Sequence, residues 1–332
     1  MSLNHSNISI FVPHLGCKHM CSFCNQVYIS GHEEKPDART IEKAVEDAVK
    51  SPRFNSKTAE IAFFGGSFTA IDMDYQNELL STAYKFIKQG VVRGIRISTR
   101  PDAIDENILD NLKKYGVTSI ELGAQSMDDE VLFLNKRGHS SYDVEKASKL
   151  IKEYGFELGL QMMTGLFGDT YEKSIATAEK IADLKPETVR IYPTIVLKNT
   201  YLAKLYEEGK YSPQTLEEAS EVCGELLSFF ESKNIKVIRL GLHSIEEESF
   251  IAGPWHWAFG ELCVSSIYMK KAKKMLEKEQ KGNYTLIVNK NEISKMIGQR
   301  KSNITVLREL GYNCTVIGDE KIEKYSILIK KN

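Results

Sequence analysis

The sequence predicts an α/β fold in which a partial (β/α)6 TIM-like barrel precedes a small α/β domain. Runs of apolar and β-branched residues alternate with segments of helical periodicity between residues 8 and 242. A helix follows nearly every strand, an order that is typical of parallel strands joined by right-handed crossovers. About six such units are present, fewer than the eight of a closed barrel, so the barrel is expected to be open.

The strands are expected where short apolar runs occur, and the helices where apolar residues recur every three or four positions. The expected strands are 8–14, 60–66, 93–99, 118–126, 156–165, 187–196 and 236–242. The expected helices are 40–50, 74–89, 106–115, 129–136, 142–154, 171–183 and 214–233. Because the pattern loosens beyond residue 244, we interpret 1–245 as the barrel, 246–283 as a connecting or covering segment, and 284–332 as a second domain.

The composition is that of a globular protein: 332 residues, of which 42% are hydrophobic and 27% charged. No apolar run approaches the roughly 20 residues of a membrane helix, so no spanning segment is expected. The N-terminus, MSLNHSNISIF, lacks the basic start and long apolar stretch of a signal peptide. These features predict a cytoplasmic protein.

The nearly neutral net charge hides an asymmetry. Residues 270–332 hold 15 Lys and Arg against 7 Asp and Glu, a net charge of +8, and the rest of the chain carries −9. A basic end favours a polyanionic partner, although lysines that merely keep a small domain in solution give the same count.

Three of the six cysteines, Cys17, Cys21 and Cys24, lie together in the loop GCKHMCSFCNQ after the first strand. An odd number of cysteines in a reducing compartment disfavours disulfides. A closed zinc site needs a fourth ligand, which His14, His19 or His32 could supply. A [4Fe–4S] cluster with three thiolate ligands and one open iron is the third interpretation, and the one we favour. The other cysteines, Cys223, Cys263 and Cys314, are isolated in sequence and are expected to be buried as small apolar residues.

Polar residues and glycines gather where the expected strands end, which is where active sites form in such barrels. Gly65 and Gly66 follow the second strand, where missing side chains let a ligand approach the backbone. The remaining candidates are Ser98, Arg100, Glu121, Gln125, Arg137, His139, Gln161, Arg190 and Tyr192.

A C-x3-C-x2-C loop after the first strand of a partial β/α barrel resembles the radical S-adenosylmethionine (SAM) superfamily. The resemblance implies that Cys17, Cys21 and Cys24 hold the cluster, and that its free iron chelates the amino and carboxylate groups of S-adenosylmethionine. Reductive cleavage would give methionine and a 5′-deoxyadenosyl radical, with ferredoxin or flavodoxin as electron donor. Gly65 and Gly66 would then bind the methionine amine. Gln161 and Tyr192 become the catalytic candidates, and the other strand-end residues become cofactor-binding candidates.

Within the superfamily the chain resembles the Elongator catalytic-subunit group through VPHLGCKHMCSFCNQ, FFGGSF, STRPD, ELGAQS, KRGHS and RIYPTIV. That resemblance implies modification of a tRNA wobble uridine. Two features depart from the group. The chain ends where the group's acetyltransferase domain would begin, and QMMTGLFGD carries Gln161, Thr164 and Phe167 where the group usually has a His and two prolines.

Residues 284–332 are expected to form β-α-α-β-β, an order that resembles the core of a KH RNA-binding domain. The loop between the two helices is Gly298-Gln299-Arg300-Lys301, with Lys in place of the second glycine of the G-x-x-G pattern. Gly298, Arg300 and Lys301 are therefore the RNA-binding candidates. The alternative is a structural appendage that packs on the barrel.

Two classes of function follow. One is an RNA-modifying radical enzyme to which the C-terminal domain delivers tRNA. The other is a radical oxidoreductase acting on a small molecule such as a porphyrinogen or a cofactor precursor, with a structural C-terminal domain. A non-enzymatic RNA-binding protein stabilised by iron–sulfur or zinc would require the strand-end residues to be accidental.

Overall fold

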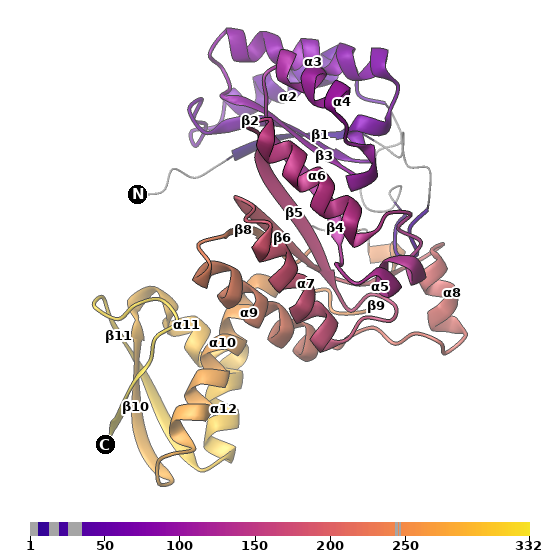
Figure 1. The fold of residues 1–332 in the computed structure, drawn as a ribbon. Helices are drawn as coiled ribbons and strands as arrows, with labels where there is room; N and C mark the ends of the chain where they lie inside the picture. The colour runs from indigo at the N-terminus through magenta and orange to yellow at the C-terminus, as the bar shows by residue number, and fades with distance from the viewer. Residues whose placement is uncertain (1–5, 13–19, 26–34, 243–244, 246) are drawn as a thin grey trace.

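In the computed structural model, which describes residues 6–12, 20–25, 35–242, 245 and 247–332, the sheet of the larger unit is entirely parallel. Seven strands form it in the order β1-β2-β3-β4-β5-β6-β8 (Figure 1). Their bounds are Ser6–Val12 (β1), Ala59–Gly65 (β2), Gly94–Thr99 (β3), Val117–Gln125 (β4), Glu157–Thr164 (β5), Thr188–Pro193 (β6) and Lys236–Leu240 (β8). Within the described residues β1 and β8 do not pair with each other, so the barrel is open and the predicted partial barrel is confirmed.

The helices between the strands lie on the outer face of the sheet, apart from two short ones, 129–134 and 201–207, which lie beside the ends of the strands (Figure 1). They are α2 Ala38–Val49, α3 Met73–Lys88, α4 Glu106–Lys114, α5 Asp129–Leu134, α6 Ser141–Glu153, α7 Tyr171–Asp183, α8 Tyr201–Glu207 and α9 Leu216–Ser232. Each of these helices begins behind an Asp, Ser or Thr whose side chain accepts a hydrogen bond from an N–H of the first turn. The caps fix where each helix starts and so where the loops at the carboxyl ends of the strands stop.

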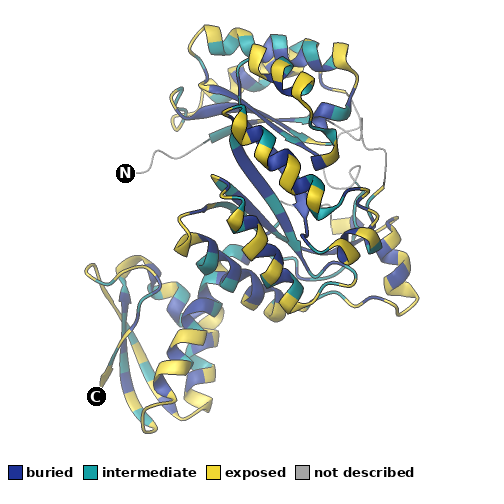
Figure 2. Cartoon of the chain, viewed as in Figure 1, coloured by how far each residue is buried: buried dark blue, intermediate teal, exposed yellow. Residues whose placement is uncertain are grey.

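The main core lies between the sheet and these helices, where alternate residues of β1 to β6 are mostly apolar and buried (Figure 2). The alternate residues point to the inner face of the curved sheet, and there the side chains are polar. Parallel pairing of β3 with β4 places Arg96 beside Ser119 and Ser98 beside Glu121. Parallel pairing of β5 with β6 places Gln161 beside Arg190. The inner face is therefore a polar lumen. Here the mouth of the barrel denotes the end at which the strands finish.

A smaller unit follows, with strands β10 Gly282–Asn289, β11 Tyr312–Asp319 and β12 Leu328–Lys331 and helices α11 Ile293–Ile297 and α12 Ser302–Glu309. Its strand order is β11-β10-β12, with β11 parallel and β12 antiparallel to β10. The predicted sequence of elements, β-α-α-β-β, is therefore present.

The segment 246–283 holds more regular structure than the sequence predicted. It contains the short strand β9 (Phe250–Ala252) and the 18-residue helix α10 (Phe259–Leu276). One side of α10 packs on α9, and its buried Tyr268, Ala272 and Leu276 share a cluster with the apolar residues of β10. The helix therefore connects the two units through packing (Figure 1). Among the described residues, no helix has the length and apolar character of a membrane span.

Candidate active site

The cysteine loop is fastened to the barrel mouth by its backbone. Ser22 donates from its hydroxyl to Asn135 Oδ1 at 2.6 Å and from its N–H to the Asn135 carbonyl at 3.0 Å. The Ser22 carbonyl accepts from the N–H of Leu202 at 2.7 Å, at the start of α8. Cys21 and Cys24 flank this anchor. Cys17 lies outside the described residues, so the three thiols cannot be placed together as one set.

Arg137 links the cysteine loop to the sheet. Its Nη1 donates to Cys21 Sγ at 2.9 Å and its Nη2 to the carbonyl of Gly123, on the inner side of β4, at 2.5 Å. Arg100 in turn donates to the Arg137 carbonyl at 2.8 Å and pairs with Asp102 through its Nε at 2.8 Å. The guanidinium of Arg137 is therefore held at the mouth beside a cluster cysteine.

Several buried polar atoms at the mouth have no hydrogen-bond partner within the described part of the chain. Buried polar atoms in folded proteins are almost always satisfied, so such a group indicates a missing polar ligand. They are Ser98 Oγ, Gln125 Oε1, Arg137 Nε, His139 Nδ1 and Thr194 Oγ1. They come from the ends of β3, β4 and β6 and from the segment after α5, and they offer both donors and acceptors.

His139 presents an acceptor to this site. Its Nε2 lies 3.3 Å from the carbonyl of Ala124, which can only accept, so Nε2 carries the proton and Nδ1 keeps its lone pair. Burial, together with the charge of Arg137, lowers the pKa of His139 to about 4. The imidazole is therefore neutral at physiological pH.

Backbone conformation also marks the mouth. Gln125 has a left-handed backbone with φ of 67°, beside a register shift between β4 and β5, and a non-glycine residue adopts this only at a cost. Gly65 has φ of 111°, and an added Cβ would lie 2.5 Å from the Val12 carbonyl oxygen. Packing against β1 thus requires Gly65 to be glycine, and the cofactor interpretation of the glycine pair depends mainly on Gly66.

Below the mouth, an ionic network fills the lumen. Glu121 accepts from Arg190 Nε at 2.8 Å and Nη2 at 3.0 Å, and from Arg96 Nη1 at 3.2 Å. Arg96 also donates to Glu60 at 2.9 Å. Both carboxylates and Arg96 are almost completely buried. Glu121 and Arg190, predicted as cofactor-binding residues, therefore bind each other, and they close the floor of the mouth.

The two catalytic candidates lie just above this floor. Gln161 donates from Nε2 to Glu121 Oε2 at 3.0 Å, which turns its carbonyl oxygen away from the carboxylate. Tyr192 receives a hydrogen bond from Arg190, and burial raises the pKa of its hydroxyl, so the phenol stays protonated at neutral pH. Both side chains are half-buried on the inner face.

Sequence reasoning missed Glu60 and Arg96 of this network and treated Cys223 and Cys263 as isolated. The predicted burial of Cys223 and Cys263 is confirmed, and although they are far apart in sequence they lie together where α9 meets α10, with their thiols hydrogen-bonded to each other. Cys314 is half-buried rather than buried. Single charged residues inside apolar strands, Glu60 in β2 and Arg96 in β3, were a signal for the lumen that the sequence did carry.

The RNA-binding candidates lie far along the chain, in the turn between α11 and α12. Gly298, Arg300 and Lys301 have φ of 81°, 51° and 66°, and the two basic side chains are exposed. Asn303, one turn further on, donates to the carbonyls of Ser265 on α10 and Met296 on α11 at 3.1 Å each, which holds the turn in place.

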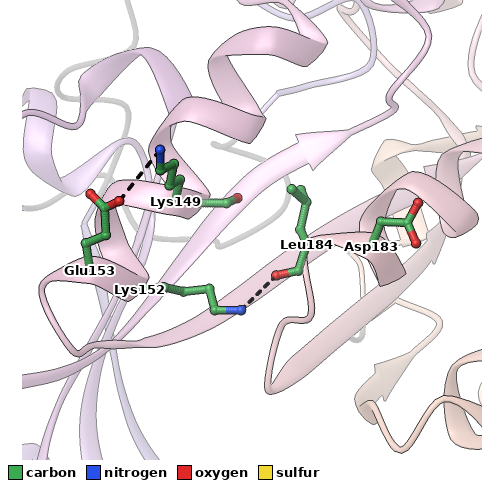
Figure 3. Close-up of a pocket in the computed structure, with 6 residues that line it drawn as sticks. Lys149, Lys152, Glu153, Asp183 and Leu184 are labelled. Atoms are coloured by element: carbon green, nitrogen blue, oxygen red, sulfur yellow. Dashed lines mark hydrogen bonds and ion pairs between the residues drawn. The ribbon is translucent and has the colours of Figure 1, made fainter.

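A surface pocket of about 410 Å³ lies elsewhere, between the ends of α6 and α7 (Figure 3). Lys152 crosses it and donates to the Leu184 carbonyl at 3.1 Å, and Lys149 pairs with Glu153 at 3.8 Å. Because α6 and α7 end at the side of the barrel opposite the mouth, this pocket is separate from the cysteine loop.

Comparisons with known proteins agree with this arrangement. The Radical SAM superfamily model matches residues 11–181, and the Radical_SAM C-terminal domain model matches residues 186–270. A solved structure, the archaeal Elp3 of Methanocaldococcus infernus with an N-terminal deletion, superposes with a TM-score of 0.64 at 25% identity. That match covers 84% of this chain and 65% of the other.

Among curated proteins, the tRNA uridine(34) acetyltransferase of Methanocaldococcus infernus is 33% identical over 183 residues, which is 49% of this chain. An uncharacterised protein of Methanocaldococcus jannaschii is 29% identical over 283 residues, 80% of this chain and 82% of that protein. The matches to three tRNA uridine(34) acetyltransferases span only 34–38% of the length of those relatives.

Proposed function

Because the chain belongs to the radical SAM superfamily, we propose that it is a tRNA-modifying enzyme that acts on a wobble uridine. As a radical SAM enzyme it uses a [4Fe–4S] cluster and S-adenosylmethionine. When bound, the reduced cluster supplies the electron that cleaves S-adenosylmethionine to methionine and a 5′-deoxyadenosyl radical. A ferredoxin or flavodoxin is the proposed electron donor.

The residues at the mouth fit these groups. The thiolates of Cys17, Cys21 and Cys24 would hold the cluster, and the guanidinium of Arg137 would position Cys21. A molecule with an ammonium, a carboxylate and hydroxyls would satisfy the unpartnered atoms of the mouth, because Ser98, Gln125 and His139 offer acceptors and Arg137 a donor. Gly66 leaves room for the methionine amine.

The lumen residues would bound the substrate. The ion pairs among Glu60, Arg96, Glu121 and Arg190 occupy the lumen below the mouth, so the substrate would bind above them. Gln161 and Tyr192 would orient it through a carbonyl acceptor and a protonated hydroxyl. Excluding water from this space protects a radical from side reactions.

One observation carries the enzymatic half of the proposal. The cysteine loop is bonded to the carboxyl ends of the strands by Ser22 and by Arg137, and it lies among buried polar atoms that await a ligand. Five buried side-chain atoms without a hydrogen-bond partner among the described residues lie at this end of the barrel, beside the loop that holds Cys21 and Cys24.

The tRNA half is supported by two observations. The related proteins named above include tRNA uridine(34) acetyltransferases, and the C-terminal residues 270–332 carry +8. The turn with Arg300 and Lys301 would contact phosphates of the RNA backbone.

The test is the release of 5′-deoxyadenosine by the anaerobically reconstituted full chain. We expect bulk tRNA to stimulate release, and small-molecule extracts freed of RNA to have no such effect. The Cys21→Ala variant is expected to lose the cluster and all release. Stimulation by the small-molecule extract alone would overturn the tRNA assignment, and stoichiometric zinc without iron would overturn the enzymatic one.

A further inference from the structure

The Trp/His-rich stretch GPWHWAFGEL forms part of the rim of the barrel mouth. The strand β9, just before it, pairs with β7 (Val196–Leu197), which follows the end of β6. Gly253 packs so closely there that an added Cβ would lie 3.0 Å from the Cα of Ile195. Figure 1 shows β9 at the end of the molecule toward which β4 and β5 point.

The other end of the stretch closes on β8. An added Cβ on Gly241, which follows β8, would lie 2.8 Å from the ring of Phe259. The segment between Gly253 and Phe259 therefore spans the carboxyl ends of the last two strands of the open barrel.

Aromatic rings stand in a row on this segment. The ring centroids of Phe250 and Trp255 are 6.2 Å apart, and those of Trp255 and Trp257 are 4.7 Å apart at an angle of 66°. Phe250 and Trp255 are half-buried, but Trp257 is 71% exposed. One indole is thus supported by its neighbour and presented to solvent.

The backbone holds this indole in place. The N–H of Ala258 donates to His256 Nδ1 at 3.0 Å, and the N–H of Phe259 donates to the His256 carbonyl at 3.1 Å. The turn that carries Trp257 is therefore fixed on both sides of the exposed ring, which reduces the entropy lost when a partner stacks on it.

We propose that Trp257 is a stacking platform for a nucleobase of single-stranded RNA at the barrel mouth, an inference that rests on the proposed tRNA function. Bases stack on exposed aromatic rings whatever their sequence, because every base has a π face. Another rim aromatic, Tyr201, is less suited, because Lys136 Nζ covers its ring at 3.4 Å from the centroid. Exposed Lys198 follows β7, whose Leu197 pairs with Phe250 of β9, so it would add a positive charge for a phosphate on the same rim.

The size of the feature favours a base over a protein. A stable protein interface buries about 800 Å² on each partner. Here one indole is exposed, and the aromatic residues beside it are half-buried. A single ring with a basic neighbour matches a nucleotide.

The chain offers a direct readout, because Trp255 and Trp257 are its only tryptophans. All tryptophan emission therefore comes from the proposed site. The probe is a 17-nucleotide anticodon stem-loop, compared with the same hairpin whose loop nucleotides are abasic. We expect the intact loop to quench the emission of the reconstituted full chain, and the abasic loop, which keeps its phosphates, to bind without quenching.

Variants separate stacking from other roles. Trp257→Leu is expected to weaken binding of the intact loop on the order of tenfold and to remove the preference over the abasic loop. Trp257→Phe should restore part of both. The control is Val49→Ala, because Val49 is an exposed apolar residue, 47%, but lies at the end of α2, on the side opposite the mouth; its binding and quenching should match the wild type.

The stacking role of Trp257 would be wrong if the stem-loop bound to saturation without a change in tryptophan emission. It would also be wrong if Trp257→Leu bound the stem-loop with the affinity of the wild type. Either result would still show that the chain binds tRNA. Absence of any RNA binding would overturn the proposed function and this inference together. Without RNA, the tryptophan emission could instead change with protein concentration while sedimentation shows dimers. That result would place Trp257 in a contact between copies of the chain and would overturn the proposal.

Discussion

Arg137 joins two segments that lie more than a hundred residues apart, the cysteine loop and β4. Its Nη1 donates a hydrogen bond to Cys21 Sγ at 2.9 Å, and cysteine sulfur is the atom that binds metal. Its second Nη holds the Gly123 carbonyl, so the position of the cation is set by the sheet and not by the loop. The hydrogen bond from Arg137 therefore fixes Cys21 relative to the end of β4.

We expect Arg137→Ala to lose iron on the order of tenfold faster than the wild type in the presence of a chelator. The reason is that hydrogen bonds to charged groups are worth about 1.5–3 kcal/mol. Arg137→Lys should fall between the two, because it keeps the charge without the planar fork. Lys136→Ala, an exposed neighbour, is the matched control. Equal rates of iron loss for Arg137→Ala and the wild type would show that the contact does not position Cys21.

His139 gives the fold a dependence on pH. Its folded pKa is about 4, below the ordinary value of 6.5, so between these values the unfolded chain binds a proton that the folded chain does not. Stability is therefore complete above about pH 6.5 and falls as the pH drops toward 4, by up to about 3 kcal/mol.

The measurement is urea unfolding at pH 7 and pH 5 of the wild type and His139→Gln, both without cofactors. Gln keeps a donor for the Ala124 carbonyl but does not titrate, so the variant should lose less stability between the two pH values, by about 2 kcal/mol. If the two proteins lose the same free energy, the buried imidazole does not drive the pH dependence.

For single residues, the sequence predicted which side chains at the mouth would be polar. It did not predict which groups these side chains would pair with. Glu121, Arg190 and Arg137 were all expected near the cofactor. The structure pairs Glu121 with Arg190 and places Arg137 on a cysteine, because the lumen of a seven-stranded sheet brings together side chains from strands far apart in sequence. Residue type gives the chemistry, and only the register of the sheet decides which groups meet.

Among the elements, α10 shows where periodicity fails. Its buried residues face α9 on one side and β10 on the other, so its apolar positions do not form one stripe. The strands of the barrel are the opposite case. Their outward residues are mostly apolar and their lengths are short, so both the type and the approximate bounds of each strand were predictable from the sequence.

Helices α9 and α10 pack so closely that one added methyl group on α9 would disturb the contact between them. An added Cβ on Gly224 of α9 would lie 2.6 Å from the Cys263 carbonyl and 2.7 Å from Ser266 Oγ. Gly224→Ala is therefore expected to lower the free energy of unfolding by about 1–3 kcal/mol, because the two helices must move apart.

Gly260→Ala on α10 is the control for that change, since the described atom nearest to an added Cβ there is the Leu240 carbonyl oxygen at 3.8 Å. It should leave stability nearly unchanged in chemical denaturation. A Gly224→Ala protein as stable as the control would mean that α10 is not packed on α9 in solution.

For the molecule as a whole, charge is divided between its two units. The charged side chains inside the barrel are paired with one another. Residues 1–269 carry a net charge of −9, whereas residues 270–332 carry a net charge of +8. A polyanion is therefore drawn to the C-terminal unit in solution. The open barrel was predictable from the sequence because each strand is joined to the next by a helix. The position of the C-terminal unit was not predictable, because it depends on the packing of α10.

The basic C-terminal unit presents Arg300 and Lys301 in the turn between α11 and α12. Leu276 of α10 shares a core with Tyr284 and Leu286 of β10, so removing the unit would expose apolar surface, and substitutions in the full chain are the better test. If Arg300 and Lys301 contact phosphates, each contributes about −0.7 to the slope of log affinity against log salt concentration for a single strand. Arg300→Ala with Lys301→Ala should therefore flatten the slope for tRNA by up to about 1.4 and weaken binding of all sequences alike.

The matched control is Lys330→Ala with Lys331→Ala, which removes the same charge from exposed residues of β12. Filter binding at several salt concentrations distinguishes the two double variants. Iron content and basal cleavage of S-adenosylmethionine should be unchanged in both, because neither pair lies near the cysteine loop. If both variants flatten the slope equally, RNA is attracted by the net charge of the unit, and the turn between α11 and α12 is not its binding site.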